Sequence, residues 1–312
     1  MKNEDALRSM LLIRHFETRG EAAYQQGFVG GFYHAYSGQE AIGVSVVEVF
    51  GQENWYLTTY RCHALALLLG EDPKSLMAEL YGRSTGNAKG RGGSMHLYSK
   101  RMLGGFAIVG GHLAVALGAA FSIKYFGRDQ EVAICLLGEG AVAQGAFHES
   151  LNLAALWSLP VIFIIENNRW GMGTHVSRAI CTKSIAEVQA PSYGISGYTL
   201  DGMDYYACKE GFTKIRAEIL KERRPILVEC ICERFKGHSV SDPGLYRTKD
   251  ALKLAQERDP ILQLRKKSGI SDEQFKVIDK EVRERVMEAV KFAEESPWPS
   301  LATLEEDVYA DY

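Results

Sequence analysis

The segment Glu131-Val-Ala-Ile-Cys-Leu-Leu-Gly-Glu-Gly140 decides the fold class, together with the later segment Val161-Ile-Phe-Ile-Ile-Glu-Asn-Asn168. Each begins as a short apolar run and ends in turn-forming residues, which is the pattern of a buried strand. A helical pattern from about Gln144 to Leu156 lies between them. Strand, helix and strand within about 35 residues make a βαβ unit, whose two strands run parallel. The sequence therefore predicts an α/β protein.

The rest of the chain extends this unit in both directions. A third buried strand is expected over 226–232, Gly-rich or polar loops over 82–112 and 233–250, and helices over about 4–26, 38–50, 63–69, 203–223 and 259–295. The economical arrangement is a doubly wound, mostly parallel sheet with helices on both faces. We expect a single domain spanning residues 1–312, with an N-terminal helix at about 4–26 and a C-terminal helical extension at about 250–312.

Composition excludes several classes of protein. The chain has 312 residues, 46% hydrophobic and 24% charged, as in an ordinary globular protein. Its 36 Lys and Arg against 39 Asp and Glu give a net charge of -3, so nucleic acid is not expected as the main partner. No apolar run reaches the roughly 18–20 residues of a membrane span. The six Cys lack C-x-x-C spacing, and several are predicted to be buried, reduced thiols.

The start of the chain bears on its location. Met1-Lys2-Asn3-Glu4-Asp5 leads directly into a helical pattern, without the apolar core of a signal peptide. We therefore expect a cytoplasmic protein of a bacterium, or a mitochondrial matrix or plastid protein whose transit peptide has been removed.

Polar residues at the ends of the two predicted strands form the candidate site. Glu139 follows the first strand, and Asn167 and Asn168 follow the second. The carboxyl ends of parallel strands form the ligand-binding edge of an open sheet. Carboxylate and amide oxygens suit a Mg²⁺ ion that also holds phosphate oxygens, and the helix starting near Gln144 directs N–H groups at an anion. The hypothesis is a Mg²⁺-diphosphate site; the alternative is a glycine turn with an exposed Glu.

Two other phosphate-binding motifs fit less well. The dinucleotide fingerprint G-x-G-x-x-G would need a third glycine three residues after Gly140, but the next one is Gly145. The P-loop pattern G-x-x-x-x-G-K-[ST] does not occur in the sequence.

A resemblance to a known family rests on an ordered set of motifs. The segment Gly138-Glu-Gly-Ala-Val-Ala-Gln-Gly145, followed by Glu166-Asn-Asn168, resembles the thiamine diphosphate motif, usually G-D-G and then N-N. The chain also resembles the α subunits of the pyruvate dehydrogenase E1 component, which are thiamine diphosphate-dependent 2-oxo acid dehydrogenases. The motifs that carry this are Gly38-Gln-Glu-Ala41, Tyr60-Arg-Cys-His63, Gly90-Arg-Gly-Gly-Ser-Met-His96, Ile108-Val-Gly110, Gly237-His-Ser-Val-Ser-Asp-Pro-Gly244 and Tyr246-Arg-Thr248. The resemblance covers about residues 10–295.

The resemblance implies thiamine diphosphate and Mg²⁺ as cofactors. Glu139, Asn168 and the backbone carbonyl of Trp170 would be the protein's metal ligands. Tyr60 and Arg61 would lie over the cofactor, with Arg61 as a phosphate fork. The other implied cofactor contacts are Gly140 and Ala141 at the diphosphate and Gly105, Ala107, Ile108, Val109 and Gly110 around the rings.

Three histidines are implied at the channel through which a 2-oxo acid enters. They are His34, His63 and His238, with His238 also contacting the cofactor. Each lies in a Gly-rich or loop motif, and an imidazole can transfer protons near neutral pH. His96 and His148 are interpreted as ordinary polar residues.

The chain also departs from the usual pattern of this family. Glu139 stands where most pyruvate-type members have Asp, as in the branched-chain 2-oxo acid type, and its extra methylene must be accommodated by the backbone. Ala143 replaces the usual Asn, Trp170 the usual Tyr, and Lys236 a His that lies two residues before His238.

The implied activity is decarboxylation of pyruvate, followed by reductive acetylation of the lipoyl group of an E2 acyltransferase. No second strand-rich half follows residue 250, so an E1β subunit would complete the site in an α₂β₂ heterotetramer. The small-residue segment Gly110–Ala120 is a candidate contact, with intrachain core as the alternative. Two other functions remain open: a branched-chain 2-oxo acid or acetoin dehydrogenase E1α, and a non-catalytic binding subunit of the same fold.

Overall fold

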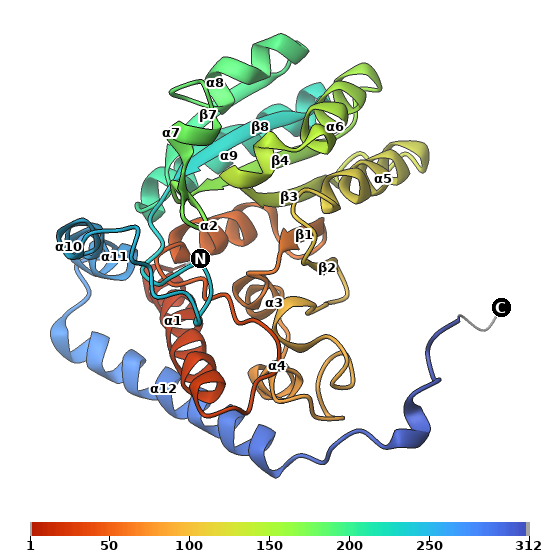
Figure 1. The fold of residues 1–312 in the computed structure, drawn as a ribbon. Helices are drawn as coiled ribbons and strands as arrows, with labels where there is room; N and C mark the ends of the chain where they lie inside the picture. The colour runs from red at the N-terminus through yellow and green to blue at the C-terminus, as the bar shows by residue number, and fades with distance from the viewer. Residues whose placement is uncertain (1, 310–312) are drawn as a thin grey trace.

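The two strands that the sequence analysis started from pair directly. β3 (Ala133–Gly138) and β4 (Val161–Asn167) run parallel, with Ala133 opposite Val161 and Gly138 opposite Glu166. In the computed structural model, which describes residues 2–309, they lie at the centre of a six-stranded sheet (Figure 1). The strand order is β2-β1-β3-β4-β8-β7, and all neighbouring pairs are parallel. The prediction of a doubly wound α/β sheet is confirmed.

The strands that sequence reasoning missed lie toward the edges of the sheet. The strand expected over 226–232 is β8 (Ile226–Ile231), but β1 (Trp55–Thr59), β2 (Met102–Phe106) and β7 (Ser196–Asp201) were not predicted. The expectation that 82–112 is one long loop is wrong at β2. Its sequence Met-Leu-Gly-Gly-Phe contains two glycines, which weaken the local preference for a strand, and pairing with β1 supplies the order instead. A separate short hairpin joins β5 (Trp170–Gly171) and β6 (Thr174–His175).

Helices precede, connect and follow these strands. The predicted helices lie within a few residues of their expected positions, except that the one expected over 259–295 is interrupted between Ser268 and Asp272. The helices Pro73–Leu80 and His112–Tyr125 were not predicted. The α-helices are α1 (Asn3–Gln25), α2 (Glu40–Phe50), α3 (His63–Leu68), α4 (Pro73–Leu80), α5 (His112–Tyr125), α6 (Gly145–Leu156), α7 (Val176–Ala179), α8 (Ala186–Gln189), α9 (Tyr205–Glu222), α10 (Lys249–Glu257), α11 (Pro260–Ser268) and α12 (Asp272–Glu295). Single 3₁₀ turns are η1 (Gly93–Met95), η2 (Glu139–Ala143), η3 (Ala190–Tyr193) and η4 (Leu301–Thr303).

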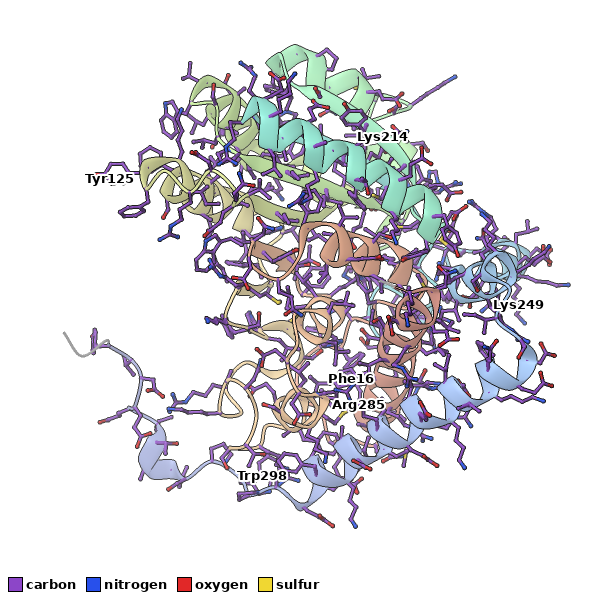
Figure 2. The ribbon with its side chains drawn as sticks, turned by 180° about the vertical axis from the view of Figure 1, so that it is seen from behind. Phe16, Tyr125, Lys214, Lys249, Arg285 and Trp298 are labelled. Carbon is purple, nitrogen blue, oxygen red and sulfur yellow. The ribbon has the colours of Figure 1, made fainter. Side chains whose placement is uncertain are left out.

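Two hydrophobic clusters cover the two faces of the sheet. Successive side chains of a strand point to opposite faces, so Ile134 and Leu136 of β3 enter one cluster and Cys135 and Leu137 the other. The first cluster also contains α1, α2 and α9, and the second contains α5 and α6. Figure 2 shows α9 across the back of the sheet, with Lys214 on its outer side.

The C-terminal helical extension packs on the N-terminal helices. α12 contacts α1 and α4, and its buried residues recur every three or four positions, as an amphipathic helix requires. These residues are Ile278, Val282, Val286, Ala289 and Ala293. The following segment returns along the loop after α4, where the Arg83 guanidinium lies 3.9 Å from the centre of the Trp298 ring.

The cysteines and the helices of residues 2–309 bear on two further predictions. Five of the six cysteines are buried free thiols, whereas Cys181 is exposed. None of the helices in this part of the chain combines the length and apolar character needed to cross a membrane.

Candidate active site

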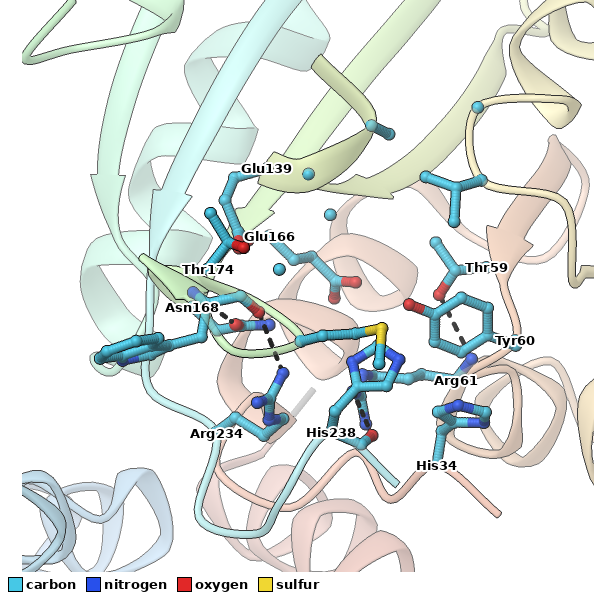
Figure 3. Close-up of a pocket in the computed structure, with 18 of the residues that line it drawn as sticks. His34, Thr59, Tyr60, Arg61, Glu139, Glu166, Asn168, Thr174, Arg234 and His238 are labelled. Atoms are coloured by element: carbon cyan, nitrogen blue, oxygen red, sulfur yellow. Dashed lines mark hydrogen bonds between the residues drawn. The ribbon is translucent and has the colours of Figure 1, made fainter. Parts of the chain in front are cut away.

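A cavity of about 530 Å³ lies at the carboxyl ends of the central strands (Figure 3). Thr59 ends β1, Gly138 ends β3, and Glu166 lies near the end of β4; all three line the cavity. Arg234 and His238 enter from the segment after β8. This is the edge at which open parallel sheets bind ligands, because the connections on the two sides of the sheet diverge there.

Most of the predicted site residues meet in this cavity. Those that line it are His34, Tyr60, Arg61, Ala107, Val109, Gly110, Glu139, Gly140, Ala141, Asn168, Trp170 and His238. Glu139 and Asn168 lie on one side and Tyr60 and His34 on the other (Figure 3). Gly105 and Ile108 are not among the lining residues: Gly105 is buried in β2, and Ile108 is 76% exposed.

Glu139 is a buried carboxylate at the start of η2. It is 3% exposed, and its Oε1 atom has no hydrogen-bond partner in the described part of the chain. Burial raises the pKa of Glu139, and the backbone N–H groups of Glu139 and Asn168 lower it in part. Because an unpaired buried carboxylate oxygen is costly, this atom suits a cation. The residue therefore fits the metal role that the resemblance implied for it.

The two other implied metal ligands lie beside Glu139 but already have partners. Asn168 donates from Nδ2 to Gln39 Oε1 (3.1 Å), and its Oδ1 accepts from the Trp170 N–H (3.2 Å). The Trp170 carbonyl accepts from Arg234 Nη1 (3.1 Å). Each of these acceptor oxygens has a second lone pair, which leaves room for a metal.

Two arginines are buried in the cavity wall. Arg61 donates to the backbone carbonyls of Ala35 and His238, both at 2.7 Å, so its terminal nitrogens are already engaged. Burial, together with the nearby charge of Arg234, lowers the pKa of Arg61 to about 10. A phosphate fork at Arg61 would thus require at least one of these carbonyl contacts to be exchanged.

Three rings form a cluster on the opposite wall. The His34 ring lies 4.2 Å from the Tyr60 ring and 5.1 Å from the His238 ring, between centroids. Burial, together with the charge of Arg61, lowers the pKa of His34 to about 2 and that of His238 to about 4. Both histidines are therefore neutral near pH 7. Both Nδ1 atoms lack a hydrogen-bond partner among residues 2–309.

His63 lies away from this cavity. It is fully buried: its Nδ1 contacts both Glu17 carboxylate oxygens at 3.1 Å, and its Nε2 contacts Ser94 at 2.9 Å. The expectation that His63 lines the substrate channel does not match its position. The reason is that α3 begins at His63 and directs this side chain into the core toward α1.

Comparison with known proteins agrees with this geometry. The family model described as "Dehydrogenase E1 component" matches residues 8–302. The chain belongs to the dehydrogenase E1 component family. This family is thiamine diphosphate dependent.

Relatives from several organisms extend the match over nearly the whole chain. The pyruvate dehydrogenase E1 component subunit alpha of Rhizobium meliloti is 42% identical over 310 residues, which cover 97% of this chain and 88% of that protein. The corresponding Rickettsia bellii protein is 40% identical, with 97% and 94% covered. The chloroplastic subunit alpha-3 of Oryza sativa is 37% identical over 327 residues, with 99% and 76% covered. The family recognised from the motifs is confirmed.

Sequence reasoning gave no role to three residues that line the cavity of this E1 component. Glu166 is 2% exposed, and burial raises its pKa to about 7, although the Tyr36 hydroxyl donates to it. Gln39 holds Asn168, and Arg234 holds the Trp170 carbonyl. Glu166 could have been found, because it directly precedes the Asn pair at the strand end. Arg234 could not, since its approach depends on the turn after β8.

Proposed function

We propose that this chain is the E1α subunit of a pyruvate dehydrogenase complex. It would decarboxylate pyruvate with thiamine diphosphate and reductively acetylate the lipoyl group of an E2 acyltransferase. The observation that carries the proposal is the meeting of Glu139 and Asn168 with the ring cluster of His34, Tyr60 and His238 in one cavity. The names of the relatives support the same activity.

Glu139, Asn168 and the Trp170 carbonyl would hold Mg²⁺ at the diphosphate. A carboxylate with amide and carbonyl oxygens is a donor set that Mg²⁺ accepts. Gly138 and Gly140 leave backbone open beside it: a Cβ at Gly138 would meet no described atom within 4 Å. The N–H groups of Gly140 and Ala141 would then bind diphosphate oxygens.

Bound thiamine diphosphate supplies a nucleophilic carbon and an electron sink. The chain's own residues orient the reactants and exclude water. His34 and His238 are neutral, so each can offer one N–H donor and one proton acceptor to the 2-oxo acid. Tyr60 is half-buried, and burial raises the pKa of its hydroxyl, which keeps it protonated as a donor. The ring cluster therefore presents neutral donors to the reacting group.

We propose a partner E1β chain and an α₂β₂ heterotetramer, with residues 1–312 of this chain forming one thiamine diphosphate-binding domain. The segment 110–120 supports a partner, because α5 has two different sides. Leu113, Ala116 and Leu117 belong to the core, whereas Ala114, Val115, Gly118 and Phe121 are exposed. Intrachain core accounts for one face of the helix, and we propose the partner contact for the other. The Rhizobium meliloti and Rickettsia bellii relatives, at 42% and 40% identity, are bacterial, and a bacterial cytoplasm is the location we propose.

A substrate panel tests this function against its alternatives. The chain, co-expressed with its partner subunit, would be assayed with pyruvate, a branched-chain 2-oxo acid and acetoin, each with thiamine diphosphate and Mg²⁺. Pyruvate is expected to give the highest kcat/KM. A preference for either other substrate would reassign the subunit within the family. Absence of thiamine diphosphate binding would identify a non-catalytic subunit instead.

A further inference from the structure

We propose that Glu79 is a positioning residue for the cavity, because its carboxylate is the anion around which the loop 86–93 folds. This loop belongs to the Gly-rich segment 82–112, in which the sequence analysis gave residues 86–93 no role. It follows α4 and leads to η1, below β2 in Figure 1. The link to cofactor binding rests on the proposed function, whereas the folding of the loop around Glu79 does not.

Four backbone N–H groups converge on the Glu79 carboxylate. Oε2 accepts from Ala88 (2.9 Å) and Gly90 (2.8 Å), and Oε1 accepts from Gly92 (2.7 Å) and Gly93 (3.2 Å). The residue is fully buried in the last turn of α4. Hydrogen bonds to a carboxylate are stronger than those between neutral groups, and burial removes water as a competitor. The loop thus has one charged centre that satisfies four of its donors.

The backbone conformation of the loop directs its N–H groups toward the Glu79 carboxylate. Lys89, Gly90 and Gly93 have positive φ values of 57°, 79° and 60°, which turn successive N–H groups to one side. Such concave runs of N–H groups form anion-binding nests. At Gly86 a Cβ would lie 2.2 Å from Glu79 Oε2, so only glycine permits this approach. The loop 86–93 is therefore a nest whose resident anion comes from its own chain.

The end of this nest forms part of the cavity wall. Ser94 follows directly and contacts His63, and Met95 lines the cavity. A Cβ at Gly105 would lie 2.5 Å from the Met95 carbonyl, so β2 approaches η1 closely. β2 leads into Phe106 and Ala107, which also line the cavity. A displaced nest would therefore shift both Met95 and the end of β2.

Removing the carboxylate tests the nest by chemical rescue. Glu79→Ala leaves four partly buried donors around a space that a small carboxylate can fill. The variant, co-expressed with its partner subunit, would be melted in sodium acetate and in sodium chloride of equal ionic strength. Acetate is expected to raise the Tm of Glu79→Ala by about 3 °C more than that of the unchanged protein. An equal acetate effect on both proteins would overturn the proposal.

Asp72→Ala is the matched control. Asp72 caps the start of the same helix by accepting from the Lys74 N–H at 3.0 Å, so its loss weakens α4 without touching the nest. If the Tm of Glu79→Ala cannot be measured because it fails to fold, Glu79→Gln keeps the shape while turning an NH₂ group toward the donors. Trypsin cleavage after Lys89 and Arg91 then measures directly how often the loop opens. Cleavage there is expected to accelerate about tenfold in Glu79→Gln and not in Asp72→Ala; equal rates would overturn the proposal.

Cofactor binding distinguishes a positioning role of Glu79 from a role in stability alone. Glu79→Gln is expected to raise the KM for thiamine diphosphate at least about tenfold, with kcat at saturation within about twofold of the unchanged enzyme. Asp72→Ala should leave both constants unchanged. An unchanged KM in Glu79→Gln would contradict the positioning role. If the unchanged enzyme binds no thiamine diphosphate, the proposed function is wrong. The rescue and cleavage tests then still decide whether the loop 86–93 folds around the Glu79 carboxylate.

Discussion

Glu139 shows how a single residue joins the fold to the proposed chemistry. It is the first residue after β3, so the parallel sheet places it at the ligand-binding edge. Its side chain is buried, and one of its oxygens has no partner among residues 2–309, an arrangement that does not stabilise the folded chain by itself. The proposed Mg²⁺ would remove that cost by pairing the charge.

Glu139→Ala is expected to weaken the binding of thiamine diphosphate with Mg²⁺ by at least about 100-fold, because one of three protein ligands is lost. The protein should stay folded, since the substitution removes a poorly satisfied buried charge. Titration calorimetry measures the affinity, and thermal unfolding checks the fold. Glu149→Ala, at an exposed position on α6, is the control. Unchanged affinity in Glu139→Ala would remove Glu139 from the metal site.

The buried His34 contributes to the response of stability to acid. The pKa of His34 falls from its ordinary 6.5 to about 2 in the folded chain, so the unfolded chain binds more protons below about pH 6.5. The free energy of unfolding should therefore fall as pH drops from 7 toward 5. His34→Gln should flatten this dependence by up to about 1.4 kcal/mol per pH unit. Urea titrations at pH 7 and pH 5 measure it, and parallel slopes for the two proteins would contradict the assignment.

At the scale of elements, the sequence predicts the strands whose conformation follows from their own pattern of residues. β3, β4 and β8 are rich in apolar residues and buried on both faces, and all three were found. β2 and β7 lie at the edges, with glycines and polar residues, and only pairing in the sheet gives them their conformation. The same limit applies to the site. Glu139 and Asn168 follow from strand ends, whereas the burial of His63 and the approach of Arg234 depend on packing between distant segments.

The loop 236–248 is the element most closely joined to the cavity. Asp242 accepts from the His238 N–H (2.6 Å), the Gly244 N–H (2.9 Å) and the Tyr246 hydroxyl (2.6 Å). Arg234 contacts both Tyr246 and the Trp170 carbonyl, so the loop is connected to an implied metal ligand. We predict that this loop is mobile without cofactor and closes over the cofactor when it binds.

Limited proteolysis with trypsin tests this loop at Lys236 and Arg247. Thiamine diphosphate with Mg²⁺ is expected to slow cleavage in the unchanged protein. Asp242→Asn removes the charge that three donors share, so cleavage should be about tenfold faster with or without cofactor. Identical cleavage of the unchanged protein in both states would contradict the closure.

At the scale of the whole molecule, one face of α5 is left exposed by the rest of residues 2–309. Gly118 lies in the middle of it, and a Cβ there would meet no described atom within 4 Å. The aromatic residues Phe121, Tyr125 and Trp157 extend the same exposed region, where Figure 2 labels Tyr125 at the edge of the molecule. Small residues beside exposed rings are consistent with a face that packs against another chain.

Gly118→Glu is expected to leave the single chain folded, because the new side chain has open space and glutamate favours a helix more than glycine does. Assembly with the partner subunit should weaken by at least about tenfold, since a charge would be buried in the contact. Size-exclusion chromatography with light scattering measures the assembled fraction. Lys214→Glu, on α9 at the opposite face, should assemble normally. Normal assembly of Gly118→Glu would exclude this face from the interface.

The most direct test of the central claim is the release of CO₂ from pyruvate, with thiamine diphosphate and Mg²⁺ present. It would be measured for this chain alone and for the chain co-purified with its partner subunit. We predict turnover by the assembled protein and negligible turnover by the single chain, because in the proposed function the partner subunit supplies the other half of the cofactor site. Full turnover by the purified chain at the size of a monomer, or none by the assembled protein, would contradict the account.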